Sequence, residues 1–587
     1  MTNSFVPEWA KHVVWYQIFP ERFWNGDPSN DPTVQAQSNS WPHDVASPWQ
    51  VHPWTSDWYE LQPYEKRNGR DIWFNIQRRR YGGDLQGIFE RLDYLQDLGV
   101  TALYLNPVFD APSSHKYDGA TYHHIDPYFG PDPEGDRRLI ATETFDDPRT
   151  WVWTSADKLM LELIAEVHRR GMRIIFDGVF NHMGLNSVAF RDVVKHGSAS
   201  RYADWFKITD WNKATPYAPF TYLGWFGVNE LPELNQDENG LTAAPRQYVF
   251  NATRRWLDPD GDGNPQDGID GWRLDVAFCV RHPFWKAWRQ WVRSINPEAY
   301  LVAEIVNEDA NEPYLQGDEF DAVMHYDFAF ACVEFFVERR LTVTEFDREL
   351  RRTREAYPPG VAYVMQNLLD SHDTNRIASH IVNRGRLAYR NWQTNQPQSQ
   401  VSNNPNYATR APNAEEKRLL KLIVLLQMTY VGAPMIYYGD EAGMWGANDP
   451  CCRKPMVWPE LHYAPEAVQP DGAARPTAHP VVFDHDLHTY YRQLIHLRNS
   501  SLALRVGDFN TRLTDDARGL YAYERRHAHE RVLVALNTGP TAQRLTLALG
   551  ADVVWKVVVG GEAALIASGA GLTLEVPAAT GVILQNA

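Results

Sequence analysis

Cysteine is scarce in this chain. Its 587 residues include only four, Cys279, Cys332, Cys451 and Cys452, and their spacing matches neither a CxxC pair nor a Cys/His zinc motif. A disulfide scaffold is therefore excluded, and a reducing compartment fits the composition. The N-terminal segment lacks the basic region and apolar stretch of a signal peptide, so we expect the cytoplasm; a periplasmic protein would have to have lost its leader.

Positive charge and long apolar runs are also in short supply. Lys and Arg number 57 against 74 Asp and Glu, which gives a net charge of −17. Phosphate groups would be repelled, so we expect neither nucleic acid nor a membrane surface as a partner. The most apolar stretch, residues 419–438, contains Lys421, Gln427 and a Gly-Ala-Pro break. It predicts a buried helix followed by a strand, and not a bilayer span.

Short apolar runs alternate with amphipathic segments from residue 13 to about 500, a pattern that predicts strand–helix units around a parallel sheet. One helix signal begins with Asp84 as N-cap and ends at Gly99. Eight such units predict an α/β fold, the (β/α)₈ TIM barrel. The expected strands are residues 13–20, 101–107, 173–180, 269–276, 300–305, 322–326, 362–369 and 434–438.

Two further regions interrupt or follow this alternation. Residues 183–245, after the third strand, are numerous enough to form an inserted subdomain, domain B. From residue 502, short alternating runs such as 531–537 and 551–559 predict a C-terminal antiparallel β-domain. We therefore expect a barrel built from residues 1–182 and 246–501, an inserted domain at 183–245 and a β-domain at 502–587.

Three carboxylates, Asp275, Glu304 and Asp373, stand where predicted strands end, and strand ends converge on one mouth of a barrel. A carboxylate at the edge of an apolar strand costs stability unless an ion pair or a function retains it. Any one of them alone is more often structural. Together they fit glycoside hydrolysis, which needs one carboxylate and one carboxylic acid. Arg273, on the same strand face as Asp275, would keep that carboxylate ionised, whereas Glu304 would need crowding by other acids or apolar groups to stay protonated.

Four blocks resemble, in order and spacing, the signature blocks of the α-amylase superfamily. They are Asp177-Gly-Val-Phe-Asn-His182, Gly271-Trp-Arg-Leu-Asp275, Glu304 and Ser371-His-Asp373. Residues 231–235, 317–324 and 448–458 resemble the group of neopullulanases, cyclomaltodextrinases and maltogenic amylases. The resemblance implies a retaining hydrolase of cyclodextrins or short maltooligosaccharides. Asp275 would be its nucleophile, Glu304 its general acid and then base, and Asp373 the stabiliser that engages sugar hydroxyls.

The resemblance also implies a set of substrate contacts. Tyr117 would stack under the cleaved sugar, and His182 and His372 would donate hydrogen bonds to it. Asp449 and Arg453 would grip the non-reducing end, although such a pair could equally be a structural salt bridge. The full expected set is His115, Tyr117, His182, Arg273, His372, Asp449 and Arg453.

Two segments resemble calcium loops, in which alternating oxygens surround a hard cation, and structural Ca²⁺ is the expected cofactor. By resemblance, the ligands of the first site are Asn25, Asp27, Asn30, Asp31, Gly82 and Asp84. The second, residues 258–267, starts like an EF-hand loop but has Ile269 where the bidentate Glu belongs, so it could be a plain turn. Its candidate ligands are Asp258, Asp260, Asp262 and Asp267.

The chain departs from the group on the leaving-group side of the site. Phe278-Cys279 replaces the group's Asn-Glu, and Val306 replaces its Trp. The preference for α-1,4 or α-1,6 bonds, and for water or a sugar as acceptor, therefore stays open.

Alternatives are an α-amylase or neopullulanase preferring linear glucans or pullulan, and a transglycosylase of the trehalose-synthase type. A non-catalytic glucan-binding relative and a barrel of unrelated chemistry are disfavoured, because the three carboxylates are retained. The barrel should begin near residue 13, which leaves no room for the group's N-terminal β-domain, and the oligomeric state stays open.

Overall fold

The computed structural model describes residues 5–306, 310–385, 389–549, 553–560, 565–567 and 571–586. Its central sheet contains eight parallel strands in the order β10-β9-β8-β3-β2-β1-β12-β11. An isolated parallel bridge between Met324 and Gln366 joins the two ends of this sheet, which closes the predicted barrel. The strands are β1 (Trp15–Ile18), β2 (Ala102–Leu105), β3 (Arg173–Gly178), β8 (Gly271–Leu274), β9 (Tyr300–Ala303), β10 (Ala322–Val323), β11 (Gln366–Asn367) and β12 (Ala433–Tyr437).

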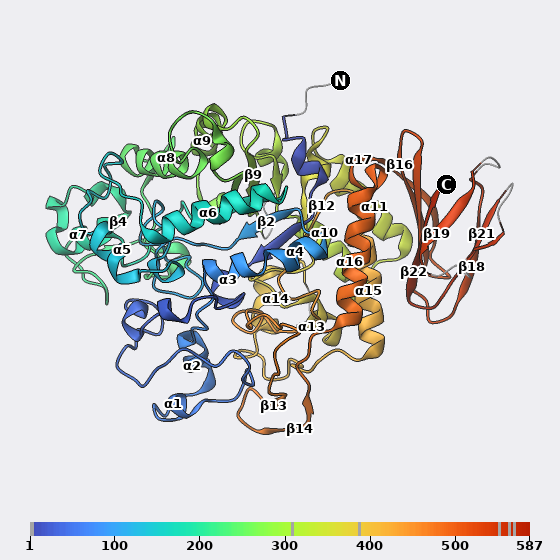
Figure 1. Ribbon diagram of the computed structural model, residues 1–587, viewed down its shortest axis with the longest axis horizontal. Coiled ribbons are helices and arrows are strands. Elements are labelled where there is room, and N and C mark those ends of the chain that lie inside the picture. The colour runs from blue at the N-terminus through green and yellow to red at the C-terminus, as the bar shows by residue number, and fades with distance from the viewer. Residues whose placement is uncertain are drawn as a thin grey trace.

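Helices surround the barrel, and its strands are buried on both faces as parallel sheets require (Figure 1). The strand register aligns Asp177 of β3 with Arg273 of β8, and Arg273 with Val302 of β9, so that their C-terminal ends lie at one level. The main helices are α3 (Leu85–Glu90), α4 (Leu92–Leu98), α6 (Ser155–Arg169), α8 (Ala243–Leu257), α9 (His282–Ile295), α10 (Tyr326–Cys332), α11 (Val343–Glu355), α13 (Ile377–Val382), α15 (Ala414–Thr429) and α16 (His485–Ser500).

The helix predicted from residue 84 forms in two parts. Asp84 caps α3 by accepting a hydrogen bond from the Gly87 N–H, and Gly99 ends α4 with a φ of 96° in the left-handed region. The two helices are separated at Arg91. The predicted buried helix and strand within residues 419–438 are α15 and β12.

Two sequence predictions were wrong in detail. The expected strand 362–369 begins instead as the helical turn α12 (Val361–Val364), and only Gln366–Asn367 pairs as a strand. The connection between β9 and β10 was expected to carry a full helix, but its described residues contain only the 3-10 helix Glu312–Leu315; residues 307–309 lie outside the description. Pro313 and Gly317 fall within this short connection, and neither residue favours a longer helix.

Long segments after β1, β2 and β3 surround the barrel mouth. The first contains α1 (Pro63–Lys66) and α2 (Ile72–Arg78), and the second contains α5 (Pro133–Ile140). The third contains α7 (Val188–His196) and two small hairpins, β4 (Ile208–Asp210) with β5 (Thr221–Tyr222) and β6 (Gln236–Asp237) with β7 (Gly240–Leu241). In Figure 1 these segments lie on the side of the molecule away from the C-terminal sheets.

The C-terminal region follows the short helix α17 (Leu502–Val506) and forms two antiparallel sheets. In β16, Tyr521 and Tyr523 pack toward the barrel core, whereas Leu520 and Ala522 belong to a second core within the β-region, as the period of two in a strand requires. Residues 551 and 552 of the predicted run 551–559 lie outside the description; the rest contains β19. The strands are β15 (Asp508–Asp515), β16 (Leu520–His527), β17 (Glu530–Asn537), β18 (Gln543–Leu547), β19 (Trp555–Val559), β20 (Leu565–Ala567), β21 (Leu572–Val576) and β22 (Thr580–Asn586).

Among the described residues, no helix combines the length and apolar character needed to cross a bilayer.

Candidate active site

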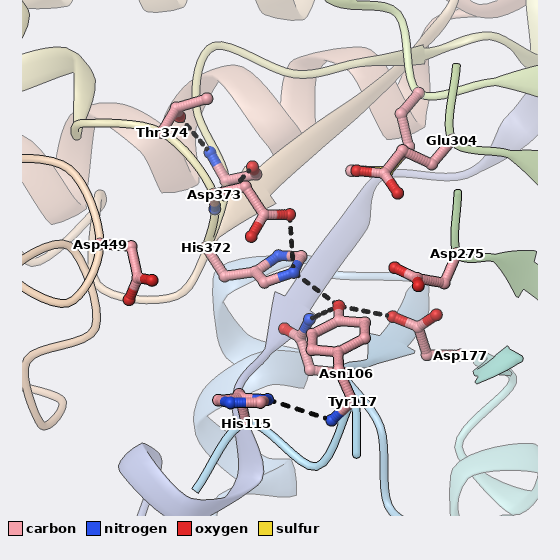
Figure 2. A network of polar contacts seen from close by, with 12 residues as sticks. Asn106, His115, Tyr117, Asp177, Asp275, Glu304, His372, Asp373, Thr374 and Asp449 are labelled. Carbon is pink, nitrogen blue, oxygen red and sulfur yellow. Dashed lines mark hydrogen bonds and ion pairs between the residues drawn. The ribbon is translucent and has the colours of Figure 1, made fainter. Parts of the chain in front are cut away.

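A buried arginine connects three carboxylates at the C-terminal mouth of the barrel. The Nη1 atom of Arg273, on β8, lies 2.8 Å from Asp177 Oδ1 and 2.8 Å from Asp275 Oδ1. Its Nη2 atom lies 2.8 Å from Glu304 Oε2. Asp177 belongs to β3, while Asp275 and Glu304 directly follow β8 and β9, so adjacent strands bring these side chains together. Figure 2 shows the carboxylates of Asp275, Glu304 and Asp373 facing a common space.

One guanidinium cannot neutralise three carboxylates, and the electrostatics of the cluster reflect this. Burial raises the pKa of Asp275 well above its usual range, although Arg273 opposes the shift. Burial also raises the pKa of Glu304, and the charge of Asp373 adds to this effect. The predicted Arg273–Asp275 ion pair is present, and it favours the carboxylate form of Asp275 against the effect of burial. Asp275 and Glu304 titrate as a pair that retains a proton more readily than free carboxylates do.

The hydrogen bonds of Glu304 indicate where that proton can reside. Glu304 Oε2 accepts a hydrogen bond from the Val276 N–H at 2.9 Å and faces Arg273. Its Oε1 atom is therefore the oxygen left to carry a proton. Val276 adopts φ 40° and ψ 47°, a left-handed conformation that is strained for a β-branched residue. The strained turn aims the N–H of Val276 at Glu304 directly after Asp275.

The third carboxylate, Asp373, lies in a different electrostatic environment. His372 Nε2 lies 2.9 Å from its Oδ2, and Arg453 Nη2 lies 3.1 Å from its Oδ1. These two groups hold the pKa of Asp373 below its usual range despite burial. Its side chain is 26% exposed, against 10% for Asp275 and 6% for Glu304, so Asp373 is the most open of the three.

Tyr117 and His372 connect the two sides of the mouth. The Tyr117 hydroxyl lies 2.9 Å from Asp177 Oδ2 and 2.5 Å from His372 Nε2, and the two rings are parallel with centroids 5.3 Å apart (Figure 2). Gln17 Nε2 donates to His372 Nδ1 at 2.8 Å, which leaves Nε2 as the ring nitrogen directed at Asp373 and Tyr117.

The remaining predicted substrate contacts lie around this centre. His182 Nε2 is 3.2 Å from the Tyr117 carbonyl oxygen, and burial lowers the pKa of His182 to about 4. His115 accepts a hydrogen bond from the Tyr117 N–H at 3.1 Å, and burial lowers its pKa as well. Both histidines are therefore neutral near pH 7. Arg453 Nη1 pairs with Asp449 Oδ1 at 2.8 Å, so the salt bridge considered as the alternative is present. Arg453 also reaches Asp373, which places the pair beside the candidate reacting groups.

Sequence reasoning missed two contributors to the site. Gln17 of β1 orients His372, and Tyr104 of β2 donates a hydrogen bond to Asp177 at 2.7 Å. Asp177, which begins the first signature block but was given no role, pairs with Arg273. Gln17 and Tyr104 lie inside short apolar strands and are fully buried. A polar residue within a barrel strand was the signal that could have identified them, because it needs a buried partner.

The first predicted calcium loop has features that fit a cation. Asn25 Oδ1 and Asn30 Oδ1 are buried, with no hydrogen-bond partner among the described residues. Burial and the charges of nearby carboxylates raise the pKa of Asp31 to about 6. Gly82 has a φ of 76°, and a Cβ there would lie 2.1 Å from Asp31 Oδ1, so a glycine is required at this close approach. Unsatisfied amide oxygens beside ionisable carboxylates are a donor set that suits Ca²⁺.

The other two predicted ligands of this loop have hydrogen-bonding roles of their own. Asp84 accepts hydrogen bonds from the N–H groups of Gly26, Asp27 and Gly87 and from Asn30 Nδ2. Asp27 accepts from the N–H and hydroxyl of Ser29. Both carboxylates thus fix the loop that presents Asn25, Asn30 and Asp31.

The second loop brings three of its four candidate ligands together. Carboxylate oxygens of Asp258, Asp260 and Asp267 lie within 4.8 Å of one another. Asp262 is not part of this group, and its Oδ1 accepts a hydrogen bond from the Asn264 N–H at 2.7 Å. Hydrogen bonds from Gly263, Asp262 and Asp260 backbone N–H groups to these carboxylates are also those of a turn.

At the mouth of a parallel barrel, carboxyl groups that contact one arginine form the arrangement expected of a glycoside hydrolase with a TIM-barrel fold. Residues 17–143 and 155–397 match the family model described as alpha amylase, catalytic domain. The chain belongs to the α-amylase family and is a glycoside hydrolase.

Several proteins of this family are similar to the chain over most of its length. The chain is 37% identical over 545 residues to neopullulanase 2 of Thermoactinomyces vulgaris, covering 92% of this chain and 72% of the relative. It is 34% identical over 553 residues to a cyclomaltodextrinase of Geobacillus thermopakistaniensis, covering 94% and 73%. A solved cyclomaltodextrinase structure superposes with a TM-score of 0.69 at 30% identity, covering 99% of this chain and 79% of that one.

Proposed function

We propose that this protein is a retaining hydrolase that cleaves α-1,4 bonds of cyclodextrins and short maltooligosaccharides by double displacement. The observation that carries the proposal is the contact of Asp275 and Glu304 with the same Arg273 guanidinium, each at 2.8 Å. Sharing one guanidinium favours the short carboxyl separation of retaining enzymes, because inverting enzymes need room for a water molecule between the two groups.

In the first step, Asp275 Oδ2 attacks the anomeric carbon, since its Oδ1 is held by Arg273. The Glu304 carboxylic acid gives its proton to the glycosidic oxygen, the bond from that oxygen to the anomeric carbon breaks, and a glycosyl ester forms on Asp275. The raised pKa of Glu304 favours its protonated form for this step, and the Arg273 cation favours the carboxylate form of Asp275.

In the second step, the Glu304 carboxylate accepts a proton from water, and the water oxygen attacks the same anomeric carbon. Asp275 leaves as a carboxylate, so two inversions retain the configuration. Asp373, held ionised by His372 and Arg453, accepts hydrogen bonds from sugar hydroxyls. The ring of Tyr117 supplies a stacking face, His182 and His115 face the cleaved sugar as neutral polar groups, and His372 offers it a ring nitrogen.

Cyclodextrins and short maltooligosaccharides are preferred as substrates because cyclomaltodextrinases and a neopullulanase are among the relatives that align over most of this chain. Transfer of the sugar to another sugar is the second candidate activity. It is favoured because the residues on the acceptor side of the site differ from those of the neopullulanase and cyclomaltodextrinase group. Phe278 and Cys279 lie on the 3-10 helix that directly follows the turn at Asp275. Burial raises the pKa of Cys279 to about 12, so its thiol stays neutral and offers no competing nucleophile.

We also propose that structural Ca²⁺ binds in the two acidic loops. Asn25, Asn30, Asp31 and the Gly82 carbonyl would hold it in the first loop, with Asp27 and Asp84 shaping that loop. Asp258, Asp260 and Asp267 would hold a second ion. A bound ion would neutralise the buried carboxylates and fix the loops; it takes no part in bond cleavage. The four cysteines are free, which fits a cytoplasmic location.

Time-resolved proton NMR tests the substrate and the stereochemistry together. The purified enzyme is given β-cyclodextrin, maltoheptaose and pullulan in parallel, and the first anomer of each product is followed. We expect α-anomers and fastest opening of the ring. A β-anomer would overturn the retaining mechanism, and inert cyclodextrin with cleaved linear chains would move the enzyme to the linear-glucan alternative.

A further inference from the structure

A cluster of two histidines and a glutamate lies outside the active site, in the segment between β2 and α6. His123 Nε2 and His124 Nε2 lie 3.3 Å and 2.9 Å from the same atom, Glu143 Oε2. These three potential ligand atoms all fall within 4.8 Å of one another. The histidine side chains are 1% and 0% exposed and that of Glu143 is 3% exposed, so the cluster is a closed interior site.

Each histidine is oriented by a second partner on its other ring nitrogen. Asp157 Oδ2, on α6, lies 2.8 Å from His124 Nδ1. The hydroxyls of Thr121 and Tyr248 lie 2.7 Å and 2.9 Å from His123 Nδ1. Both Nε2 atoms are thereby aimed at Glu143. A carboxylate on one nitrogen of a histidine and a cation on the other is the arrangement that fixes histidine ligands at metal sites.

The two carboxylates around the histidines favour a positive charge at the centre of the cluster. Glu143 and Asp157 contribute two negative charges, and Arg255 lies 3.1 Å from Asp157. In the absence of a metal, the hydrogen bonds of His124 to both carboxylates raise the pKa of this ring to about 9 despite burial, so a proton supplies the second positive charge. When a metal ion displaces the proton on Nε2, Asp157 still accepts the Nδ1 proton of His124, and the lone pair on Nε2 faces the Glu143 carboxylate. Two electron pairs at 2.9 Å repel unless a proton or a metal ion lies between them.

The ligand chemistry selects the ion. Two imidazole nitrogens and one carboxylate oxygen suit zinc, whereas Ca²⁺ and Mg²⁺ prefer oxygen alone. Zinc bonds of about 2.0–2.1 Å in a tetrahedron separate ligand atoms by roughly 3.3 Å. The present spacings of 3.3 and 2.9 Å therefore need only a small side-chain adjustment. We propose that His123, His124 and Glu143 form a structural Zn²⁺ site distinct from the active site and from both calcium loops.

Such a site would fasten one connection to the rest of the barrel. Glu143 follows α5, and its Oε1 accepts a hydrogen bond from the Val152 N–H, so the ion would tie residues 141–154 to the segment before them. Trp151 lies parallel to the His123 ring with centroids 4.0 Å apart and excludes water from that side. Tyr248 adds a contact from α8.

Metal analysis of the full-length protein tests the site directly. The protein is stripped with a chelator, dialysed against Zn²⁺ or Co²⁺ in the presence of excess Ca²⁺, and measured by mass spectrometry of its metals and by visible absorption. The wild type should bind stoichiometric zinc and show the intense bands of tetrahedral Co²⁺. His123→Gln and Glu143→Gln should each lose both signals.

His282→Gln is the matched control. His282 lies 2.9 Å from Glu319, so it also pairs with a glutamate, but among the described residues this pair is not part of a potential metal cluster. This variant should keep the zinc and the cobalt bands. Trace zinc in the wild type, or cobalt bands that persist in His123→Gln, would overturn the proposal and leave a protonated His124 between its two carboxylates. The readout does not depend on substrate or activity, so it stands apart from the proposed function.

Discussion

Removal of Arg273 is the perturbation whose effect follows most directly from the geometry of the site. Its side chain is fully buried and contacts Asp177, Asp275 and Glu304, each at 2.8 Å. Arg273→Met leaves these three carboxylates without a cation between them. Breaking a buried ion pair on one side costs about 3–5 kcal/mol. If about 3 kcal/mol of this falls on the transition state, kcat/KM decreases roughly 150-fold.

The pH dependence distinguishes an electrostatic role from simple loss of packing. Arg273 lowers the pKa of Asp275 and Glu304 against burial, so the substitution raises both values further. Both limbs of the pH profile of kcat/KM should move to higher pH, and the decrease in kcat/KM relative to the wild type should be greatest on the acidic side. A carboxyl whose folded pKa is raised destabilises the fold as pH increases above its unfolded pKa. The stability deficit of Arg273→Met should therefore grow between pH 4 and pH 8.

Initial rates on a chromogenic maltooligosaccharide across this pH range, together with urea unfolding, measure both effects. Arg289→Met is the control. Arg289 lies on α9, outside the barrel mouth; it is also buried, and it pairs with Asp321 at 2.8 Å. It should lose stability and keep the wild-type pH profile. An unshifted profile in Arg273→Met, with or without a lower rate, would refute the electrostatic reasoning.

Three further predictions concern the calcium loop, the strained turn and the acceptor side. The pKa of Asp31 is raised to about 6, so it must ionise to bind a cation; the rise in Tm on adding Ca²⁺ should be larger at pH 7.5 than at pH 5, and Asp31→Asn should remove most of it. Equal Ca²⁺ effects at both pH values would contradict this. Val276→Gly relieves backbone strain of about 1–2 kcal/mol but loosens the N–H that binds Glu304, so urea unfolding should change little while kcat decreases several-fold. An unchanged kcat would show that the turn has no positioning role. Val306→Trp adds an aromatic surface worth about 0.5–1.5 kcal/mol, so the ratio of transfer to hydrolysis, measured by chromatography of maltotriose products, should rise a few-fold; an unaltered ratio would place Val306 outside the acceptor site.

The barrel could be predicted from sequence because its strands are buried on both faces and end in polar residues. Asp275, Glu304 and Asp373 were identified for that reason, and the structure brings them to one mouth. The helical turn at Val361–Val364 could not be predicted, since its apolar residues fit a strand equally well.

The parts that escaped prediction depend on contacts between distant segments. Gln17 and His372 are 355 residues apart, and only the closed barrel brings them within 2.8 Å. The shared burial of Asp275 and Glu304 raises the pKa of both, whereas the sequence showed only that Arg273 lies near Asp275. Likewise, His123 and His124 gain a common partner only when the chain returns with Glu143.

The central claim is that Asp275 forms a covalent glycosyl-enzyme, and trapping that ester tests it most directly. Glu304→Gln lacks the general base of the second step, while maltosyl fluoride carries a leaving group that needs no acid. The variant should therefore accumulate an adduct, which proteolysis and mass spectrometry would locate on the peptide containing Asp275. An adduct on another carboxylate, or rapid release of β-maltose with no adduct, would contradict the account.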